Sequence, residues 1–156
     1  MVALATSQEE LRDLYRELIL DHARSPRRFG RLANPSHQAE GINPLCGDKL
    51  KIYLQIDAKE KITDASFEGS GCAISVASAS LLTETVIDFS IFQAGQFFSA
   101  IVATLSHKEH QTTIELGKLK ALQGVREFPS RVKCATLAWH TLNAAIKMQN
   151  KPVTTE

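Results

Sequence analysis

Three cysteines and one aspartate are the residues of this chain best suited to chemistry. Cys46 and Asp48 lie two positions apart around a glycine, whose backbone can adopt positive φ and turn both side chains toward one point. Cys72 follows another glycine, and Cys134 supplies the remaining thiol. Three thiolates and one carboxylate suit a tetrahedral ion such as Zn²⁺. These residues could therefore bind one metal ion, provided that the fold brings them together.

Each of these residues also has a purely structural interpretation. Spacing alone does not show that they meet, because 25 residues separate Cys46 from Cys72 and 61 separate Cys72 from Cys134. A free cysteine often behaves as a small buried hydrophobe, which fits Cys134 on the apolar face of a helix. Cys72 could mark a bulge in a sheet, and Asp48 could be an ordinary turn residue. Cys46 fits burial least, because its Asn, Pro and Gly neighbours indicate a loop.

The five histidines and the basic residues before Cys134 are further candidates for the site. None of the five histidines has a His or Cys partner at zinc-finger spacing, so we assign none to the metal and expect His22 and His140 at helix surfaces or ends. Arg131 and Lys133 precede Cys134 and could stabilise a thiolate by their charge. Solvated surface charge is the competing explanation for both.

Composition restricts the class of protein. A chain of 156 residues fits a single domain, 1–156, and buries roughly 70% of its unfolded surface. A net charge of +1 favours neither nucleic acid nor an anionic membrane as a partner. The first twenty residues lack the features of a signal peptide, and no run of 18 apolar residues occurs. An odd number of cysteines fits thiols kept reduced, so we expect a cytoplasmic protein.

Apolar periodicity predicts the elements of the first half. Ser7 and Glu10 resemble a capping box, and apolar residues then recur at helical spacing up to Ala23. Prolines and glycines predict a loop over 26–45. Alternating apolar residues over 50–56, and again around 65–67 after a polar turn, predict an antiparallel hairpin.

Helices follow the strands. After Cys72 the sequence predicts a short strand and then a helix, in which the small residues 73–80 pass into Leu82, Val86 and Ile87 at helical intervals. It also predicts helices over 98–105 and 116–122, a polar connection over 107–113, and a C-terminal helix that carries Cys134. The tail from Asn150 is expected to fray. Strands before helices, without βαβ alternation, repeats or linkers, predict one α+β domain with a small antiparallel sheet.

Three segments together resemble the signature segments of the IscU/SufU iron-sulfur cluster assembly proteins. They are NPLCGD at 43–48, FEGSGCAISVASAS at 67–80 and RVKCATLAWHTL at 131–142, and the opening LYRELILDHARSPRRFG resembles the family's first helix and loop. The resemblance covers nearly the whole chain. It implies a three-stranded antiparallel sheet packed by helices, with Cys46, Asp48, Cys72 and Cys134 clustered as metal ligands at one exposed end.

The resemblance is closer to the SufU branch. Typical IscU members have a histidine directly before the third cysteine, where this chain has Lys133, and a lysine binds zinc only after losing its proton. The long interval before Cys134 and the presence of Arg131 also match SufU. A SufU-type protein implies a bound Zn²⁺ and a Cys46 that accepts persulfide sulfur from a SufS-type cysteine desulfurase. Arg131 would orient the partner or the departing thiolate, and downstream cluster-assembly proteins would be further partners.

Two other functions stay open. The first is a non-enzymatic scaffold that holds a transient iron-sulfur cluster on Cys46, Cys72 and Cys134, which requires accessible thiolates. The second is a closed structural zinc site, which we rank last because the chain can bury a core without metal. The leading interpretation is thus a zinc-dependent sulfurtransferase, and the scaffold is the alternative.

Overall fold

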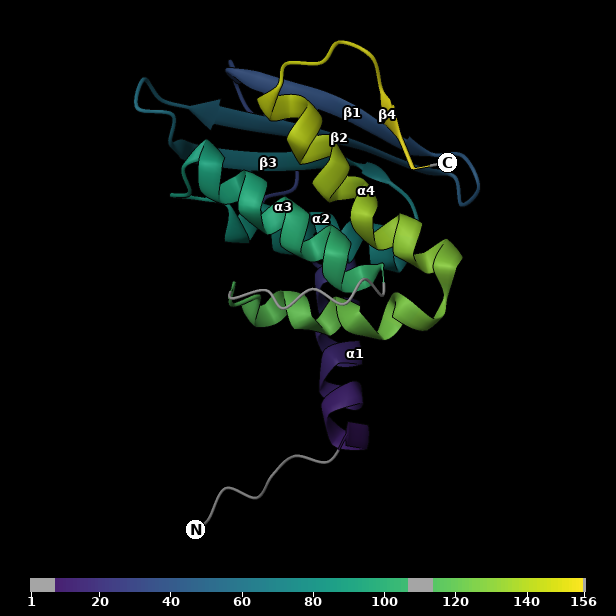
Figure 1. Ribbon diagram of the computed structural model, residues 1–156. Helices are drawn as coiled ribbons and strands as arrows, with labels where there is room; N and C mark the ends of the chain where they lie inside the picture. Colours follow the sequence, from purple (N-terminus) through teal and green to yellow (C-terminus); the bar gives the residue numbers. More distant parts are fainter. Residues whose placement is uncertain (1–7, 107–113, 156) are drawn as a thin grey trace.

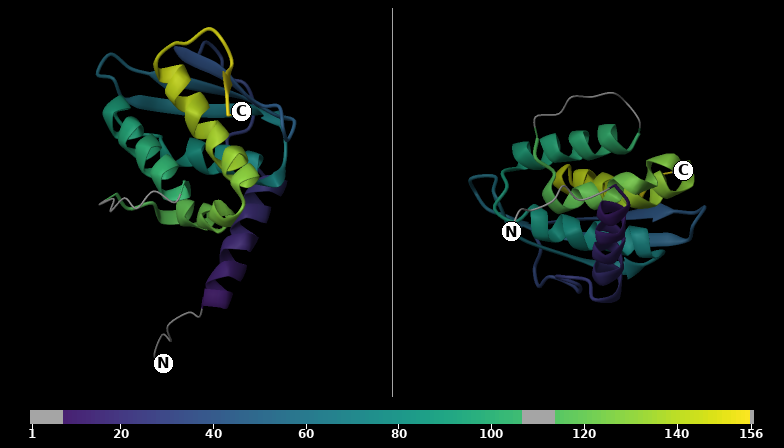
Figure 2. Two further views of the ribbon diagram at one scale, coloured as in Figure 1. Left: turned by 45° about the vertical axis from the view of Figure 1, so that its right-hand side comes forward. Right: turned by 90° about the horizontal axis from the view of Figure 1, so that it is seen from below.

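The computed structural model describes residues 8–106 and 114–155. A sheet lies across one side of the molecule, and the helices pack on one of its faces, with α1 leading away from the body (Figure 1, Figure 2). In chain order the elements are α1 (Gln8–Arg24), β1 (His37–Asn43), β2 (Asp48–Ile56), β3 (Ile62–Ser70), α2 (Ala73–Thr85), α3 (Ile91–Leu105), the 3₁₀ helix η1 (Gly117–Glu127), α4 (Pro129–Ile146) and β4 (Val153–Thr154).

The sheet is four-stranded and mixed, so the expectation of three antiparallel strands is wrong in part. Its order is β3-β2-β1-β4, in which β1 and β3 each pair antiparallel with β2 and β4 pairs parallel with β1. The predicted hairpin over 50–56 and 65–67 is confirmed as β2 and β3. The α+β class is also confirmed. The extra strand comes from the C-terminal tail, whose residues 153–154 pair with the edge of β1 instead of fraying.

Strand β1 lies inside the segment that the sequence predicted to be a loop. Its alternate residues Ala39, Gly41 and Asn43 are buried, as expected of a strand with one covered face. Gly41 lies directly beneath α4, where an added Cβ would come within 2.0 Å of Thr141 Oγ1. The glycine that looked like a turn signal therefore permits the close approach of a helix to the sheet.

The helices agree with the predictions in type more than in their bounds. Helix α3 begins at Ile91, well before residue 98, because Ser90 and Gln93 form a capping box. The segment predicted near 116–122 is the 3₁₀ helix η1. The predicted cap at Ser7 and the connection over 107–113 lie outside the described residues. Among the described helices, none has the length and apolarity needed to cross a membrane.

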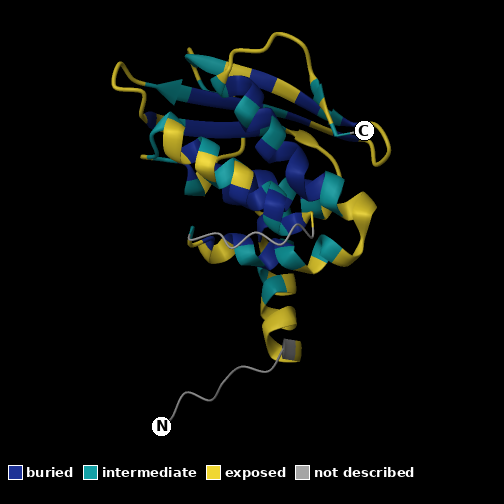
Figure 3. Cartoon of the chain, viewed as in Figure 1, coloured by how far each residue is buried: buried dark blue, intermediate teal, exposed yellow. Residues whose placement is uncertain are grey.

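The core lies between the sheet and the helices α2, α3 and α4 (Figure 3). Leu50, Ile52 and Leu54 point from β2 into this layer, where Trp139 of α4 is also buried. Burial of this apolar surface is the dominant stabilising contribution to such a fold. The turn between β1 and β2, the start of α2 and the start of α4 therefore come to the same end of the sheet on a rigid base.

Candidate metal centre

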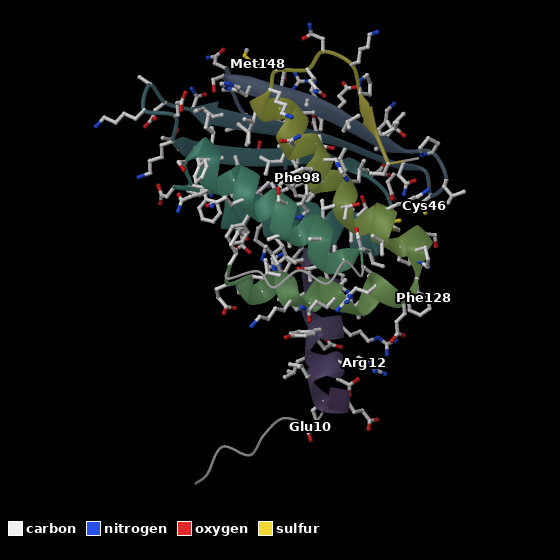
Figure 4. All side chains as sticks on the ribbon, in the orientation of Figure 1. Glu10, Arg12, Cys46, Phe98, Phe128 and Met148 are labelled. Atoms are coloured by element: carbon white, nitrogen blue, oxygen red, sulfur yellow. The ribbon has the colours of Figure 1, made fainter. Side chains whose placement is uncertain are left out.

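The four predicted ligands come from three different parts of the fold. Cys46 lies in the turn between β1 and β2, and Asp48 is the first residue of β2. Cys72 immediately precedes α2, and Cys134 lies in the second turn of α4. Figure 4 shows Cys46 at the end of the sheet where α4 begins. The topology thus brings together residues that are up to 88 positions apart (134 − 46).

Three of the four ligands already form a compact group. One ligand atom each from Cys46, Asp48 and Cys134 lies within 4.8 Å of the others. Cys72 is not part of this group of three, although its backbone adjoins it, because the Cys72 N–H donates to Asp48 Oδ1 at 2.8 Å. Among the described residues, the group contains no histidine, and His107 and His110 lie outside the described residues. The candidate site therefore consists of two thiols and one carboxylate that lie close together, with the thiol of Cys72 beside them.

The turn between β1 and β2 determines where Cys46 and Asp48 lie. The Cys46 N–H donates to the Asn43 carbonyl oxygen at 3.2 Å, and Gly47 has a φ of +72°. This left-handed conformation is easily adopted only by glycine, and it returns the chain to β2. As a result Cys46 is exposed at the turn, whereas Asp48 is only 2% exposed. The Cys-Gly-Asp spacing acts as the sequence predicted.

The Asp48 carboxylate is held by donors on both of its oxygens. Asn43 Nδ2 donates to Oδ2 at 3.2 Å, and the Cys72 N–H donates to Oδ1 at 2.8 Å. Gly71 provides the necessary space, since an added Cβ there would lie 2.4 Å from Asp48 Oδ1. A buried carboxylate requires such partners to stay ionised. Asp48 is therefore a buried carboxylate that two hydrogen bonds hold in one orientation.

Cys134 is buried, and its surroundings disfavour a lone negative charge. Its Sγ lies 3.5 Å from Asn43 Nδ2 and 3.5 Å from the Ser130 carbonyl oxygen. Burial raises the pKa of the Cys134 thiol well above its ordinary value, and the neighbouring Cys46, Asp48 and Cys72 raise it further. A cation would reverse this effect, because metal ligands give up their protons on binding. Sulfur and carboxylate donors in this number fit Zn²⁺.

The three thiols differ in their access to solvent. Cys46 is exposed, Cys72 is partly buried, and Cys134 is buried. Cys72 is the N-cap residue of α2. Cys46 is the thiol that a second protein could reach most easily.

The structure gives Arg131 and Lys133 no direct role in binding the group. Arg131 is exposed in the first turn of α4, and within the described parts of the chain it belongs to no ion pair. Lys133 is partly buried. Arg131 nevertheless lies one helical turn before Cys134, on the segment that leads into the site.

Sequence reasoning missed the functions of Asn43 and Gly71. Asn43 appeared only as a neighbour that indicated a loop, although its amide contacts both Asp48 and Cys134. Gly71 appeared only as a source of flexibility, whereas it actually makes room for the carboxylate of Asp48. The available signal was their position beside the cysteines, but neither contact is local in the sequence.

Comparison with known proteins identifies the family of this chain. Residues 14–135 match the NifU-like N-terminal domain. The chain is 41% identical over 133 residues to the zinc-dependent sulfurtransferase SufU of Bacillus subtilis, with 85% of this chain and 89% of that protein covered. It is 37% identical over 138 residues to the iron-sulfur cluster assembly scaffold protein IscU of Streptococcus pyogenes, with 88% and 86% covered.

Solved structures agree with this result. A structure from Fervidobacterium islandicum, described as a cluster assembly scaffold protein of the SUF system, matches with a TM-score of 0.78 and 34% identity. That match covers 83% of this chain and 94% of the other. The chain therefore belongs to the NifU-like N-terminal domain family of iron-sulfur cluster assembly proteins, which includes SufU and IscU.

Proposed function

We propose that this protein is a zinc-dependent sulfur acceptor that takes persulfide sulfur from a SufS-type cysteine desulfurase onto Cys46. The observation that carries the proposal is the position of Cys46, which is the exposed thiol of a group that also contains Asp48 and Cys134. An acceptor must be reached by the partner's persulfide, whereas residues that keep a metal in place can be buried. The similarity to a protein named as a zinc-dependent sulfurtransferase supports the same function.

The transfer is a thiol exchange at sulfur. The Cys46 thiolate attacks the outer sulfur of the desulfurase persulfide, so a new S–S bond forms at Cys46 Sγ. The S–S bond of the desulfurase breaks, and its electron pair leaves with the desulfurase cysteine as a thiolate. Cys46 then carries the persulfide, and the proton lost from its thiol balances the proton that the departing thiolate can take up. No external oxidant or reductant is needed.

The remaining residues of the group would hold the metal. Asp48, Cys72 and Cys134 are the proposed ligands beside Cys46, and a bound Zn²⁺ would stabilise its thiolate ligands at neutral pH. Both Asp48 oxygens already have donors, which keeps the carboxylate oriented when the surrounding turn moves. A reducing compartment such as the cytoplasm would keep these thiols available.

We assign Arg131 to partner orientation in this proposal. Its exposed guanidinium lies on the same helix as Cys134, one turn closer to the helix start. A guanidinium there can attract an acidic group of the desulfurase or the thiolate that departs from it. Downstream cluster-assembly proteins would then receive the sulfur from Cys46.

Desulfurase turnover tests the proposal. We compare wild type, Cys46→Ser and the matched control Leu45→Ala, whose 69% exposed side chain precedes Cys46 without offering a ligand. Cys46→Ser should abolish stimulation of a SufS-type desulfurase while the protein still carries zinc, and Leu45→Ala should retain sulfur acceptance. Zinc content is measured in each sample, because a metal-free variant would fail for another reason.

The scaffold function makes a different prediction for the same proteins. A scaffold would reconstitute a stable iron-sulfur cluster and pass it intact to an apoprotein. Full desulfurase stimulation by zinc-loaded Cys46→Ser, together with such cluster transfer by wild type, would favour the scaffold and overturn the acceptor.

A further inference from the structure

Asn43 is a buried amide that contacts two proposed metal ligands at once. It is the last residue of β1, pairs in register with Asp48 across the turn, and is 0% exposed. Its Nδ2 donates to Asp48 Oδ2 at 3.2 Å and to Cys134 Sγ at 3.5 Å. A carboxylate oxygen accepts this hydrogen bond, so the nitrogen end of the amide faces Asp48, and the same nitrogen lies beside Cys134 Sγ.

The other end of the same amide has no partner. Asn43 Oδ1 is buried and makes no hydrogen bond with any described residue. Buried amides that serve only the fold usually have both ends satisfied. The orientation of Asn43 is thus determined by the two ligand atoms and not by the needs of its own oxygen.

The contacts of Asn43 divide the ligands into two kinds. Asp48 and Cys134 are buried and share the Asn43 amide, although one lies on β2 and the other on α4. Cys46 is exposed and shares no such contact, since only its backbone bonds to Asn43. One side chain therefore links the strand and the helix at the site, whereas Cys46 is linked to Asn43 through its backbone N–H.

We propose that Asn43 is a positioning residue of the metal centre, whose amide holds Asp48 and Cys134 in place as a preformed pair of ligands. The proposal rests on the metal binding of the proposed function and is independent of sulfur transfer. Groups that hydrogen-bond to ligands orient them, and their loss typically lowers metal affinity by about 10–100-fold. Asn43→Ala removes the orienting amide but keeps both ligand side chains in the chain, so the loss of zinc affinity should be smaller than for removal of a ligand.

Zinc affinity measured by competition with a chromophoric chelator tests this role. Asn43→Ala should bind zinc about 10–100-fold more weakly than wild type. The matched control is Ser78→Ala, which removes a buried hydrogen bond of 2.6 Å to the Ala135 carbonyl oxygen, next to Cys134, without touching a ligand. The zinc affinity of Ser78→Ala should stay within about twofold of wild type, because the lost hydrogen bond orients no ligand. Asn43→Ala affinity equal to wild type, or equal losses in both variants, would overturn the proposal.

A measurement on wild type covers the case in which Asn43→Ala does not fold. In ¹⁵N-labelled, zinc-loaded protein, the side-chain amide protons of Asn43 should exchange with solvent far more slowly than those of the exposed Asn34. Equal exchange rates would contradict a held amide.

These outcomes separate this proposal from the proposed function. Wild type that binds zinc but accepts no sulfur would refute the sulfur acceptor and leave Asn43 as a positioning residue. Normal sulfur transfer together with unchanged zinc affinity in Asn43→Ala would refute the positioning role alone.

Discussion

Two clusters of polar residues differ in how many potential anions they bring together. In the His22 cluster, formed by His22, Ser80, the Arg27 N–H and Glu84, Ser80 Oγ accepts from Arg27 N at 2.8 Å and lies 2.7 Å from His22 Nδ1. The Glu84 carboxylate lies 3.7 Å from His22 Nε2. If the hydroxyl donates to Nδ1, Nε2 carries the ring proton and faces an acceptor. The cluster thereby ties α1 to α2 through Ser80 Oγ, whereas His22 Nε2 makes no hydrogen bond with any described residue.

The candidate metal centre differs from the His22 cluster in the number of potential anions that it gathers. Cys46, Asp48 and Cys134 bring three potential anions within 4.8 Å, and the Asn43 amide is the side chain that donates to two of them. Burial, and after it the neighbouring Cys46, Asp48 and Cys72, raise the pKa of Cys134, so a thiolate there is disfavoured in the absence of a cation. A cluster that pairs donors with acceptors stabilises a fold, whereas a cluster that gathers potential anions is suited to binding a cation. The predictions below test this distinction, beginning with the largest expected effect.

Asp48→Ala should lower zinc affinity by more than about 100-fold, because it removes a ligand and not merely a residue that orients one. The metal-free protein should still fold, because the hydrophobic core does not include Asp48, but it should unfold at a lower denaturant concentration, because Asn43 Nδ2 and the Cys72 N–H lose their acceptor. Chelator competition and denaturant titration measure the two effects. Unchanged zinc affinity would remove Asp48 from the ligands.

Two glycine variants separate the site from the fold. Gly71→Ala places a Cβ 2.4 Å from Asp48 Oδ1, so it should weaken zinc binding by about 10–100-fold through the displaced carboxylate. Gly41→Ala places a Cβ 2.0 Å from Thr141 Oγ1 and should instead lower the free energy of unfolding by about 1–3 kcal/mol through overpacking. The reverse pattern, with Gly41→Ala the poorer zinc binder, would remove the distinction.

His22→Asn should lower the free energy of unfolding by about 1–3 kcal/mol, because it leaves the buried Ser80 hydroxyl with a shorter partner. Zinc affinity should stay at the wild-type level, since the cluster touches no proposed ligand. Denaturant unfolding and chelator competition on one preparation give both values. A large loss of zinc affinity would show that the two clusters are coupled.

The pH dependence of stability should give the smallest effect. Burial is the main cause that lowers the pKa of His22 below 6.5, so the folded protein binds this proton less readily than the unfolded chain. Above pH 6.5 both states are neutral at this residue, and stability falls as pH drops from 6.5 toward the folded-state pKa. Metal-free wild type should therefore lose more stability than His22→Asn between about pH 7.5 and pH 5.5. Equal losses would exclude His22 as the cause.

The apolar periodicity of the sequence predicted the strands and helices whose own residues carry that periodicity. Alternating apolar residues identified β2, and the helical spacing around Cys134 identified α4. The expectation that His22 lies near a helix end was correct in position, but its side chain is buried against Ser80 of α2 and not at the surface. Pairing with a residue 58 positions away leaves no local signal.

Contacts between distant segments explain what the sequence could not predict. Strand β1 forms because Gly41 admits α4, and β4 forms because the chain returns from α4 to the free edge of β1. That the four predicted ligands lie together was implied by a resemblance and not by their spacing. The structure brings three of them together, and Cys72 contacts this group through its backbone N–H. The partnership of Asn43 with Cys134 joins residues 91 positions apart.

The central claim is that Cys46 receives the sulfur, and a single-turnover transfer with labelled sulfur tests it most directly. A desulfurase loaded with a ³⁵S persulfide is mixed with zinc-loaded wild type or zinc-loaded Cys46→Ser, and the label is located by peptide mass spectrometry without reductant. The account predicts one added sulfur atom on the peptide that contains Cys46 in wild type and none on Cys46→Ser. Label on Cys72 or Cys134 in wild type, or label retained by zinc-loaded Cys46→Ser, would contradict it.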